Sequence, residues 1–176
     1  MPIRENINEL AESNLSYFDP SWDKALLGFV ERAGDNRYVA ACYGYQAMKA
    51  ILKDKGCTPQ QIYVRLGIVR NSMRDATSPI ILTRYSRRPL WRIIREENYP
   101  IWDTLNKAIL GLGYEGNTCG GVVYNKPLCT SLLQEAQSTN NDNATMDYAQ
   151  ALHFLDESII PVSLGKYTPW FLTPVK

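Results

Sequence analysis

The chain has 176 residues, with 19 Lys and Arg against 18 Asp and Glu, one His and four Cys. This near-neutral composition excludes a charged disordered tail and a uniformly basic nucleic-acid binder, and no apolar run in the sequence is long enough for a membrane helix. The composition instead indicates a globular protein with a hydrophobic core and no membrane partner.

Residues 1–21 are expected to form an N-terminal leader ahead of the first structural unit. The opening MPIRENINEL lacks the basic-then-apolar order of a secretory signal. We therefore expect the mature chain to start near Met1 and to be cytoplasmic. In that reducing compartment the cysteines are expected to be free thiols, with Cys42 and Cys129 buried.

A first unit, residues 22–83, begins with two short apolar runs, Ala25–Val30 and Tyr38–Tyr43. The turn residues Gly34–Asn36 lie between these runs, which is typical of a β-hairpin. At the end of the unit, Ile80–Thr83 follow a proline, a residue that suits the first position of a strand.

Two helices are predicted between the hairpin and this last strand. Apolar residues repeat at helical spacing from Ala47 to Ile51, and Gly56 stands where a helix C-terminus is expected. Thr58 and Gln61 then match the capping-box pattern, with a proline at the first helical position. This is the strongest helix-start signal in the chain.

The connector, residues 84–101, overlaps the end of a basic segment whose charge is not apparent from the near-zero net charge of the whole chain. Eight arginines and one acid lie between Arg65 and Arg95, so this stretch has a charge of +7 and the remainder −6. From Pro89 the spacing predicts a short helix with one apolar and one basic face. The apolar face has Leu90, Ile93 and Ile94, and the basic face has Arg88, Arg92 and Arg95.

The second unit, residues 102–176, repeats short patterns of the first unit in the same order. Lys24–Gly28 recurs as Lys107–Gly111 with four of five residues identical. An apolar strand ending in Tyr43 corresponds to one ending in Tyr124, and both units close on Ser or Thr, Pro and three apolar residues. Because the matches are collinear, they indicate two diverged tandem copies. The alternative is a single domain in which these similarities are fortuitous.

The elements expected of the second unit follow those of the first. Its hairpin is Ile109–Tyr114 with Gly121–Tyr124, and a helix follows at Leu128–Leu133. Thr145 is expected to precede the next helix as its cap, with Asp147 in the first turn near the positive end of the helix dipole.

The sequence thus predicts an α+β fold made of two tandem diverged β-β-α-α-β repeats packed about a pseudo-twofold axis. Further short strands are considered at Ile68–Val69 and Ile159–Ile160. Each repeat would cover the open apolar face of the other. The strand edges left exposed by such short units favour a homo-oligomer.

The sequence offers few residues for metal, cofactor or acid-base chemistry. It has no C-x-x-C pair and one His, so no metal site is expected. The phosphate, dinucleotide and nucleophile fingerprints are also absent from the sequence, so no cofactor is expected. An enzyme acting on a phosphorylated substrate stays an alternative, with Glu31 or His153 as its base.

Several of these sequence patterns resemble a known protein family. KALLGFVERAG with VAACYGYQAMKAIL in the first unit, and GVVYNKPLCTSLL with SLGKYTPWFL in the second, resemble a family of short, functionally uncharacterised proteins encoded mostly in phage and prokaryotic genomes. The resemblance implies a phage or mobile-element context, and hence the cytoplasm of a host cell. It brings no activity with it.

Three interpretations compete for the arginine-rich segment. The arginines could pair with acids elsewhere in the chain and join the two units, form a pocket for a nucleotide or another phosphorylated small molecule, or bind the phosphates of a nucleic acid. The candidate anion-binding residues are Arg70, Arg74, Arg84, Arg87, Arg88, Arg92 and Arg95, and the candidate stacking residues are Tyr85 and Trp91.

From these patterns we expect a binding protein without catalytic activity. Its partner would be a host protein or an anionic, nucleotide-like small molecule that it sequesters. The resemblance to phage-encoded proteins, and not the residue patterns, implies that its role is to counteract a host defence. Nucleic acid bound through the arginine-rich connector is the alternative partner.

Overall fold

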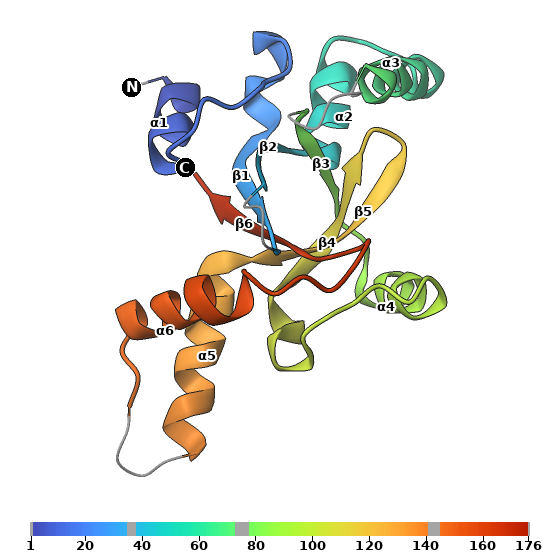
Figure 1. Cartoon of the computed structure of the whole chain (residues 1–176). Helices are drawn as coiled ribbons and strands as arrows, with labels where there is room; N and C mark the ends of the chain where they lie inside the picture. Colours follow the sequence, from blue (N-terminus) through green and yellow to red (C-terminus); the bar gives the residue numbers. More distant parts are fainter. Residues whose placement is uncertain (1, 35–37, 73–77, 141–144, 176) are drawn as a thin grey trace.

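The computed structural model describes residues 2–34, 38–72, 78–140 and 145–175, and it combines helices with one closed six-stranded β-barrel (Figure 1). The strands are β1 (Leu26–Arg32), β2 (Tyr38–Gly44), β3 (Ile80–Thr83), β4 (Ile109–Glu115), β5 (Thr118–Asn125) and β6 (Trp170–Pro174). They follow one another around the barrel in chain order. The mixed helix-and-strand class predicted from the sequence is confirmed.

The strand pairing joins the two expected units at their edges. Within each unit the hairpin is antiparallel, β1 with β2 and β4 with β5, and the last strand lies parallel to the second, β3 with β2 and β6 with β5. β3 then pairs antiparallel with β4, and β6 with β1. Instead of one unit covering an apolar face of the other, the strands of both therefore form one continuous sheet.

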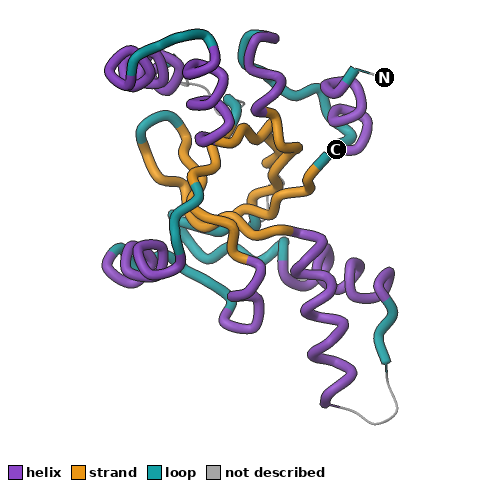
Figure 2. Tube along the Cα trace, turned by 180° about the vertical axis from the view of Figure 1, so that it is seen from behind, coloured by secondary structure: helices purple, strands orange, loops and turns teal. Residues whose placement is uncertain are grey.

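The helical elements lie on the outside of this barrel. They are α1 (Ile3–Leu10), η1 (Pro20–Ala25), α2 (Tyr45–Asp54), α3 (Pro59–Asn71), α4 (Arg87–Glu96), η2 (Asp103–Ala108), α5 (Lys126–Asn140), α6 (Tyr148–Phe154) and η3 (Leu155–Ile159). Figure 1 shows α1 and α4 on opposite sides of the barrel, and the pair α2 and α3 opposite α5 and α6. Figure 2 shows the ring of strands that these helices surround.

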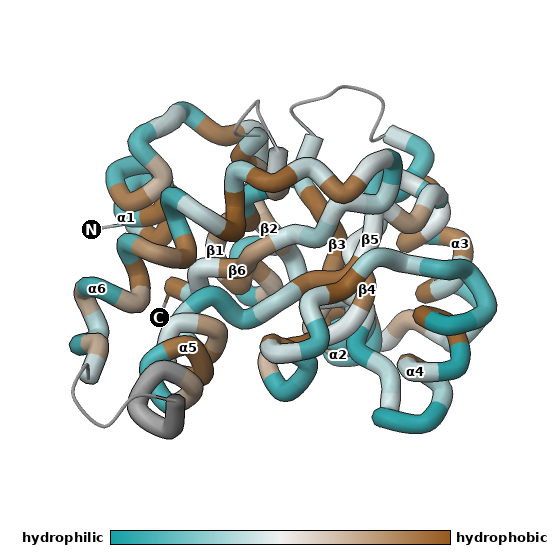
Figure 3. Tube along the Cα trace, turned by 60° about the horizontal axis from the view of Figure 1, so that its bottom comes forward, coloured by the Kyte–Doolittle hydropathy of each residue, from teal (hydrophilic) through white to brown (hydrophobic). Residues whose placement is uncertain are grey.

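The apolar side chains form one cluster inside the barrel and two between the barrel and its helices. The inner cluster contains Val30, Ala40, Cys42, Ile80, Leu82, Val123, Trp170 and Leu172. One outer cluster lies under α1, α2 and α3 and includes Ile7 and Tyr43. The other lies under α4, α5 and α6 and includes Leu90 and Tyr124. Figure 3 shows hydrophobic residues concentrated along the strands, as burial on both faces requires.

Local sequence signals explain where the helices begin. The predicted capping box starts α3, since Thr58 Oγ1 accepts from Gln61 N–H at 3.3 Å and Gln61 Oε1 accepts from Thr58 N–H at 2.9 Å. The predicted cap of α6 at Thr145 is wrong, because Asp147 caps this helix. Asp147 has the glutamine three residues downstream that completes a capping box, Gln150, and its Oδ1 accepts from Gln150 N–H at 2.8 Å.

The extra strands considered at Ile68–Val69 and Ile159–Ile160 are also wrong. Ile68 and Val69 lie in the last turns of α3, and Ile159 ends η3. Their β-branched side chains favour strands only weakly, and the helices that start upstream continue through them. The predicted turn at Gly34–Asn36 lies partly outside the described residues.

The two halves of the barrel pair their strands in matching registers. Tyr43 lies opposite Ile81 where β2 meets β3, and Tyr124 lies opposite Phe171 where β5 meets β6. All four of these side chains are fully buried. In both halves a tyrosine thus lies opposite a buried apolar residue at the same position of the sheet.

Candidate functional site

Helix α4 presents its arginines to solvent and its apolar residues to the barrel. Leu90 and Ile94 are buried against the core, whereas Arg88, Arg92 and Arg95 are exposed. This is the division of faces predicted from the spacing after the proline. The helix begins at Arg87, two residues before that proline.

A hollow of about 1040 Å³ lies along this helix. We call it the arginine groove. Its lining includes Arg87, Arg88, Trp91, Arg92 and Arg95 of α4, and Tyr99, Asp103 and Asn106 of the segment that follows. Four arginines of one helix therefore line a space whose acidic residues are Glu96 and Asp103, so the groove carries a net positive charge.

A second cavity of about 480 Å³ adjoins the same helix. Tyr85, Leu90 and Lys107 contribute to its lining, and it shares three lining residues with the arginine groove, namely Arg87, Trp91 and Asn106. These three residues therefore lie where the two cavities meet. Arg87 is the arginine that both cavities have in common.

The arginines of the groove receive little charge compensation from the protein. Arg92 Nε lies 3.1 Å from Glu96 Oε1, but the two side chains are 77% and 60% exposed, and exposed pairs of this kind contribute little stability. Among the residues that the structure describes, Arg87, Arg88 and Arg95 form no ion pair. The interpretation in which these arginines join the two units through internal salt bridges therefore lacks support.

The remaining candidates lie elsewhere. The Arg70 guanidinium lies 4.9 Å from the ring centre of Tyr45 and 5.5 Å from that of Tyr114, on the side of α3. Arg84 follows β3 and is exposed. Tyr85 has its hydroxyl 2.9 Å from that of Tyr114. Arg74 lies outside the described residues. The structure thus assembles Arg87, Arg88, Trp91, Arg92 and Arg95 from the predicted set.

The lining of the groove also includes residues that were not predicted, among them Tyr99 and Asn106. Burial raises the pKa of Tyr99, and its contact with Cys119 raises it further, so the phenol stays neutral at physiological pH. Asn106 Oδ1 is buried and has no hydrogen-bond partner among the described residues. A sequence signal for Asn106 existed, because it precedes the repeated KAILG at the position that Asp23 has before KALLG.

The two residues considered as bases do not line the groove. Glu31 Oε2 accepts a hydrogen bond from Lys126 Nζ at 2.7 Å in a half-buried ion pair. His153 is exposed on α6. The polar and aromatic lining of the groove therefore consists of arginines, aromatic rings, the carboxylates of Glu96 and Asp103, and the amides of Asn98 and Asn106.

Comparisons with known proteins assign no family to this chain. No protein-family model matches it, and neither does any curated protein or solved structure. Within the described part of the chain, no helix has the length and apolar character needed to cross a membrane. No group of three or more His, Cys, Asp and Glu side chains within that part is arranged to hold a metal ion.

Proposed function

We propose that the chain binds an anionic, nucleotide-like small molecule in the arginine groove and catalyses no reaction on it. One observation carries this proposal: Arg87, Arg88 and Arg95 surround a large hollow without an ion-pair partner among the described residues. A guanidinium offers a planar pair of N–H donors that fits phosphate or carboxylate oxygens. An external anion would supply the charge that the protein itself does not.

The other lining residues favour a ligand with a flat part as well as a charge. Trp91 and Tyr99 offer aromatic faces on which a nucleobase can stack. The hollow of about 1040 Å³ is at the upper end of the range of about 300–1,000 Å³ typical of small-molecule sites. The engagement of Glu31 by Lys126 and the exposed position of His153 support a role in binding over one in catalysis.

We also propose that the two halves are diverged tandem copies of one β-β-α-α-β unit, related by a pseudo-twofold axis. The matching strand registers and the opposed positions of α1 and α4 support this proposal. A phage origin, a role against a host defence, a host-protein partner and self-association stay predictions from the sequence.

Calorimetric titration with AMP and with inorganic phosphate, at constant ionic strength, tests the proposal. We expect saturable binding, and a ligand at a hundredfold excess over Kd should stabilise the fold by about 2.7 kcal/mol. The double variant Arg88→Ala/Arg95→Ala should lose this binding. Its matched control is Arg65→Ala/Arg84→Ala, which removes the same charge from two exposed arginines outside the groove.

Absence of saturable binding at millimolar AMP and phosphate would contradict the proposal, and so would equal losses in the two double variants. Nucleic acid is tested in parallel with a labelled single-stranded oligonucleotide. If the groove served nucleic acid, affinity for the oligonucleotide would far exceed that for AMP and would fall steeply with added salt.

A further inference from the structure

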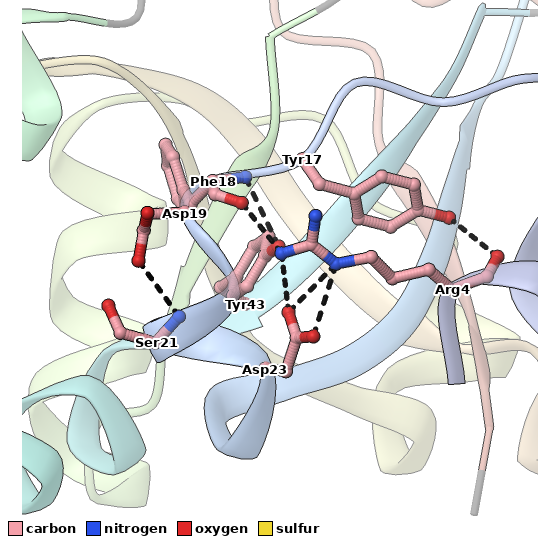
Figure 4. A network of polar contacts seen from close by, with 7 residues as sticks. All are labelled: Arg4, Tyr17, Phe18, Asp19, Ser21, Asp23 and Tyr43. Atoms are coloured by element: carbon pink, nitrogen blue, oxygen red, sulfur yellow. Dashed lines mark hydrogen bonds and ion pairs between the residues drawn. The ribbon is translucent and has the colours of Figure 1, made fainter. Parts of the chain in front are cut away.

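The first half of the barrel contains an arginine whose charge the protein itself neutralises. Arg4 of α1 donates from Nη2 to Asp23 Oδ1 at 2.6 Å and from Nε to the same oxygen at 2.9 Å (Figure 4). Its Nη2 also donates to the Phe18 carbonyl at 2.7 Å, and its guanidinium lies 4.9 Å from the centre of the Tyr17 ring. The helix α1 is thus held against η1 by a guanidinium whose anion is internal.

Asn106 has in η2 the position that Asp23 has in η1. Both are the fourth residue of a six-residue 3-10 turn, and both are followed by Lys, a buried Ala and the strand that starts the hairpin. The turns are PSWDKA and DTLNKA, so the residue that is a carboxylate in the first half is an amide in the second. In each half a helix precedes this turn, α1 before η1 and α4 before η2.

Because Asn106 stands in η2 where Asp23 stands in η1, the second half has no equivalent of the ion pair between Asp23 and Arg4 at this position. Asn106 Oδ1 is buried without a hydrogen-bond partner among the described residues, whereas Asp23 accepts two donors from Arg4. Arg87 and Asn106 both line the two cavities beside α4. The second half therefore has a cation and a polar acceptor beside the groove, but an amide at the position where the first half has the carboxylate that pairs with Arg4.

We infer that the arginine groove takes a phosphate monoester whose anion replaces the missing carboxylate, and whose adjacent hydroxyl or amine donates to Asn106 Oδ1. This inference rests on the proposed function and names the chemistry of its ligand. A phosphate dianion suits several unpaired guanidinium groups better than a single carboxylate charge does. Asn106 thereby becomes the residue that determines specificity, because a buried acceptor rejects a ligand that brings no donor.

Two ligands of equal charge separate the roles of the anion and the donor. Glycerol 3-phosphate carries hydroxyl groups near its phosphate, and ethyl phosphate carries none. The wild type should bind glycerol 3-phosphate about tenfold more tightly, as expected for one buried hydrogen bond. Asn106→Ala should remove this preference, so that the two esters bind with equal affinity. Acetate, a carboxylate without a donor, should bind more weakly than ethyl phosphate.

Asn106→Asp should reproduce the internal ion pair of the first half. We expect it to weaken the binding of both phosphate esters at least tenfold and to raise the melting temperature of the free protein. The gain in melting temperature should disappear in an Arg87→Ala background, because the new carboxylate then has no partner there.

These measurements distinguish failure of the inference from failure of the proposed function. The inference is wrong if the wild type binds AMP but binds the two esters equally, and if Asn106→Asp weakens the binding of neither ester. In that case the groove is still an anion site. If the wild type binds no phosphate compound, both are overturned. The melting temperatures are measured without ligand, so a variant that merely fails to fold is recognised directly.

Discussion

Gly28 and Gly111 make the same close approach to a neighbouring strand in the two halves of the barrel. A Cβ at Gly28 would lie 2.1 Å from the carbonyl oxygen of Thr173, and a Cβ at Gly111 would lie 2.2 Å from that of Thr83. Each glycine also lies at a register shift of its hairpin. The two positions let β1 meet β6 and β4 meet β3, which are the contacts that close the barrel.

Replacement of either glycine by alanine should therefore destabilise the fold strongly. Because the clash is with backbone, neither strand can yield locally, and we expect Gly28→Ala and Gly111→Ala each to cost about 3 kcal/mol. Urea unfolding measures the effect. The control is Gly67→Ala, where a Cβ meets nothing within 4 Å inside α3; it should stabilise by about 0.5–1 kcal/mol. Wild-type stability of either strand variant would contradict the close approach.

Tyr43 and Tyr124 anchor the chain ahead of each hairpin by equivalent hydrogen bonds. The Phe18 N–H donates to the Tyr43 hydroxyl at 3.2 Å, and the Trp102 N–H donates to the Tyr124 hydroxyl at 2.9 Å. Both tyrosines are fully buried. These bonds hold the segments that lead from α1 into η1 and from α4 into η2.

Removal of each hydroxyl should cost a similar free energy of unfolding. Tyr43→Phe and Tyr124→Phe each leave a backbone N–H without its partner, and we expect a loss of about 1–2 kcal/mol for each. The two losses should add, since the side chains belong to different apolar clusters. Tyr63→Phe is the control, because Tyr63 is 78% exposed, and it should change stability by less than about 0.5 kcal/mol. A loss in only one half would show that the two anchors are not equivalent.

The elements of the fold could be predicted from the sequence because their signals are local. The capping box at Thr58 and Gln61 and the apolar hairpin strands depend on neighbours a few residues apart. Closure of the barrel depends on β6 pairing with β1, and Phe171 lies opposite Glu31 from the other end of the chain. Hydrophobic alternation is the same in an open sheet and a closed one, so it does not specify this pairing.

The candidate site was predicted in part for the same reason. Helical spacing after Pro89 placed Arg88, Arg92 and Arg95 on one face, as the structure has them. Asn106 was missed because an asparagine in a polar stretch carries no signal of its own. Asn106 is recognised as a candidate only by comparison with Asp23, whose ion-pair partner Arg4 lies 19 residues away in another element.

Lys126 joins the two halves through two carboxylates. Its Nζ lies 2.7 Å from Glu31 Oε2 on β1 and 2.7 Å from Asp156 Oδ1 on η3. Lys126→Met leaves both carboxylates without their cation, and we expect it to cost about 3 kcal/mol in urea unfolding. Lys107→Met is the control, because Lys107 is exposed and forms no ion pair within the described part of the chain. Equal stability of the two variants would contradict a structural role for Lys126.

The same ion pairs predict a loss of stability in alkali. Burial lowers the pKa of Lys126, but hydrogen bonds with Asp156 and Glu31 raise it more, so the net direction is upward. A raised folded pKa contributes stability that is present below the unfolded pKa of about 10.4 and is lost as pH rises through the folded pKa. Stability of Lys126→Met should therefore fall less steeply than that of the wild type above that pH.

The thiols of Cys42 and Cys129 should extend this alkaline loss to lower pH. Burial raises the pKa of each from 9.0 to about 12, so the folded chain holds both protons where the unfolded chain has released them. Between about pH 9 and 12 the unfolded state binds fewer protons, and stability should fall by about 1.4 kcal/mol per pH unit for each thiol. Urea unfolding at a series of pH values measures this slope. Cys42→Ala/Cys129→Ala should lower stability at neutral pH by a constant cavity cost and flatten the slope. An unchanged slope in the double variant would mean that these thiols do not govern the alkaline transition.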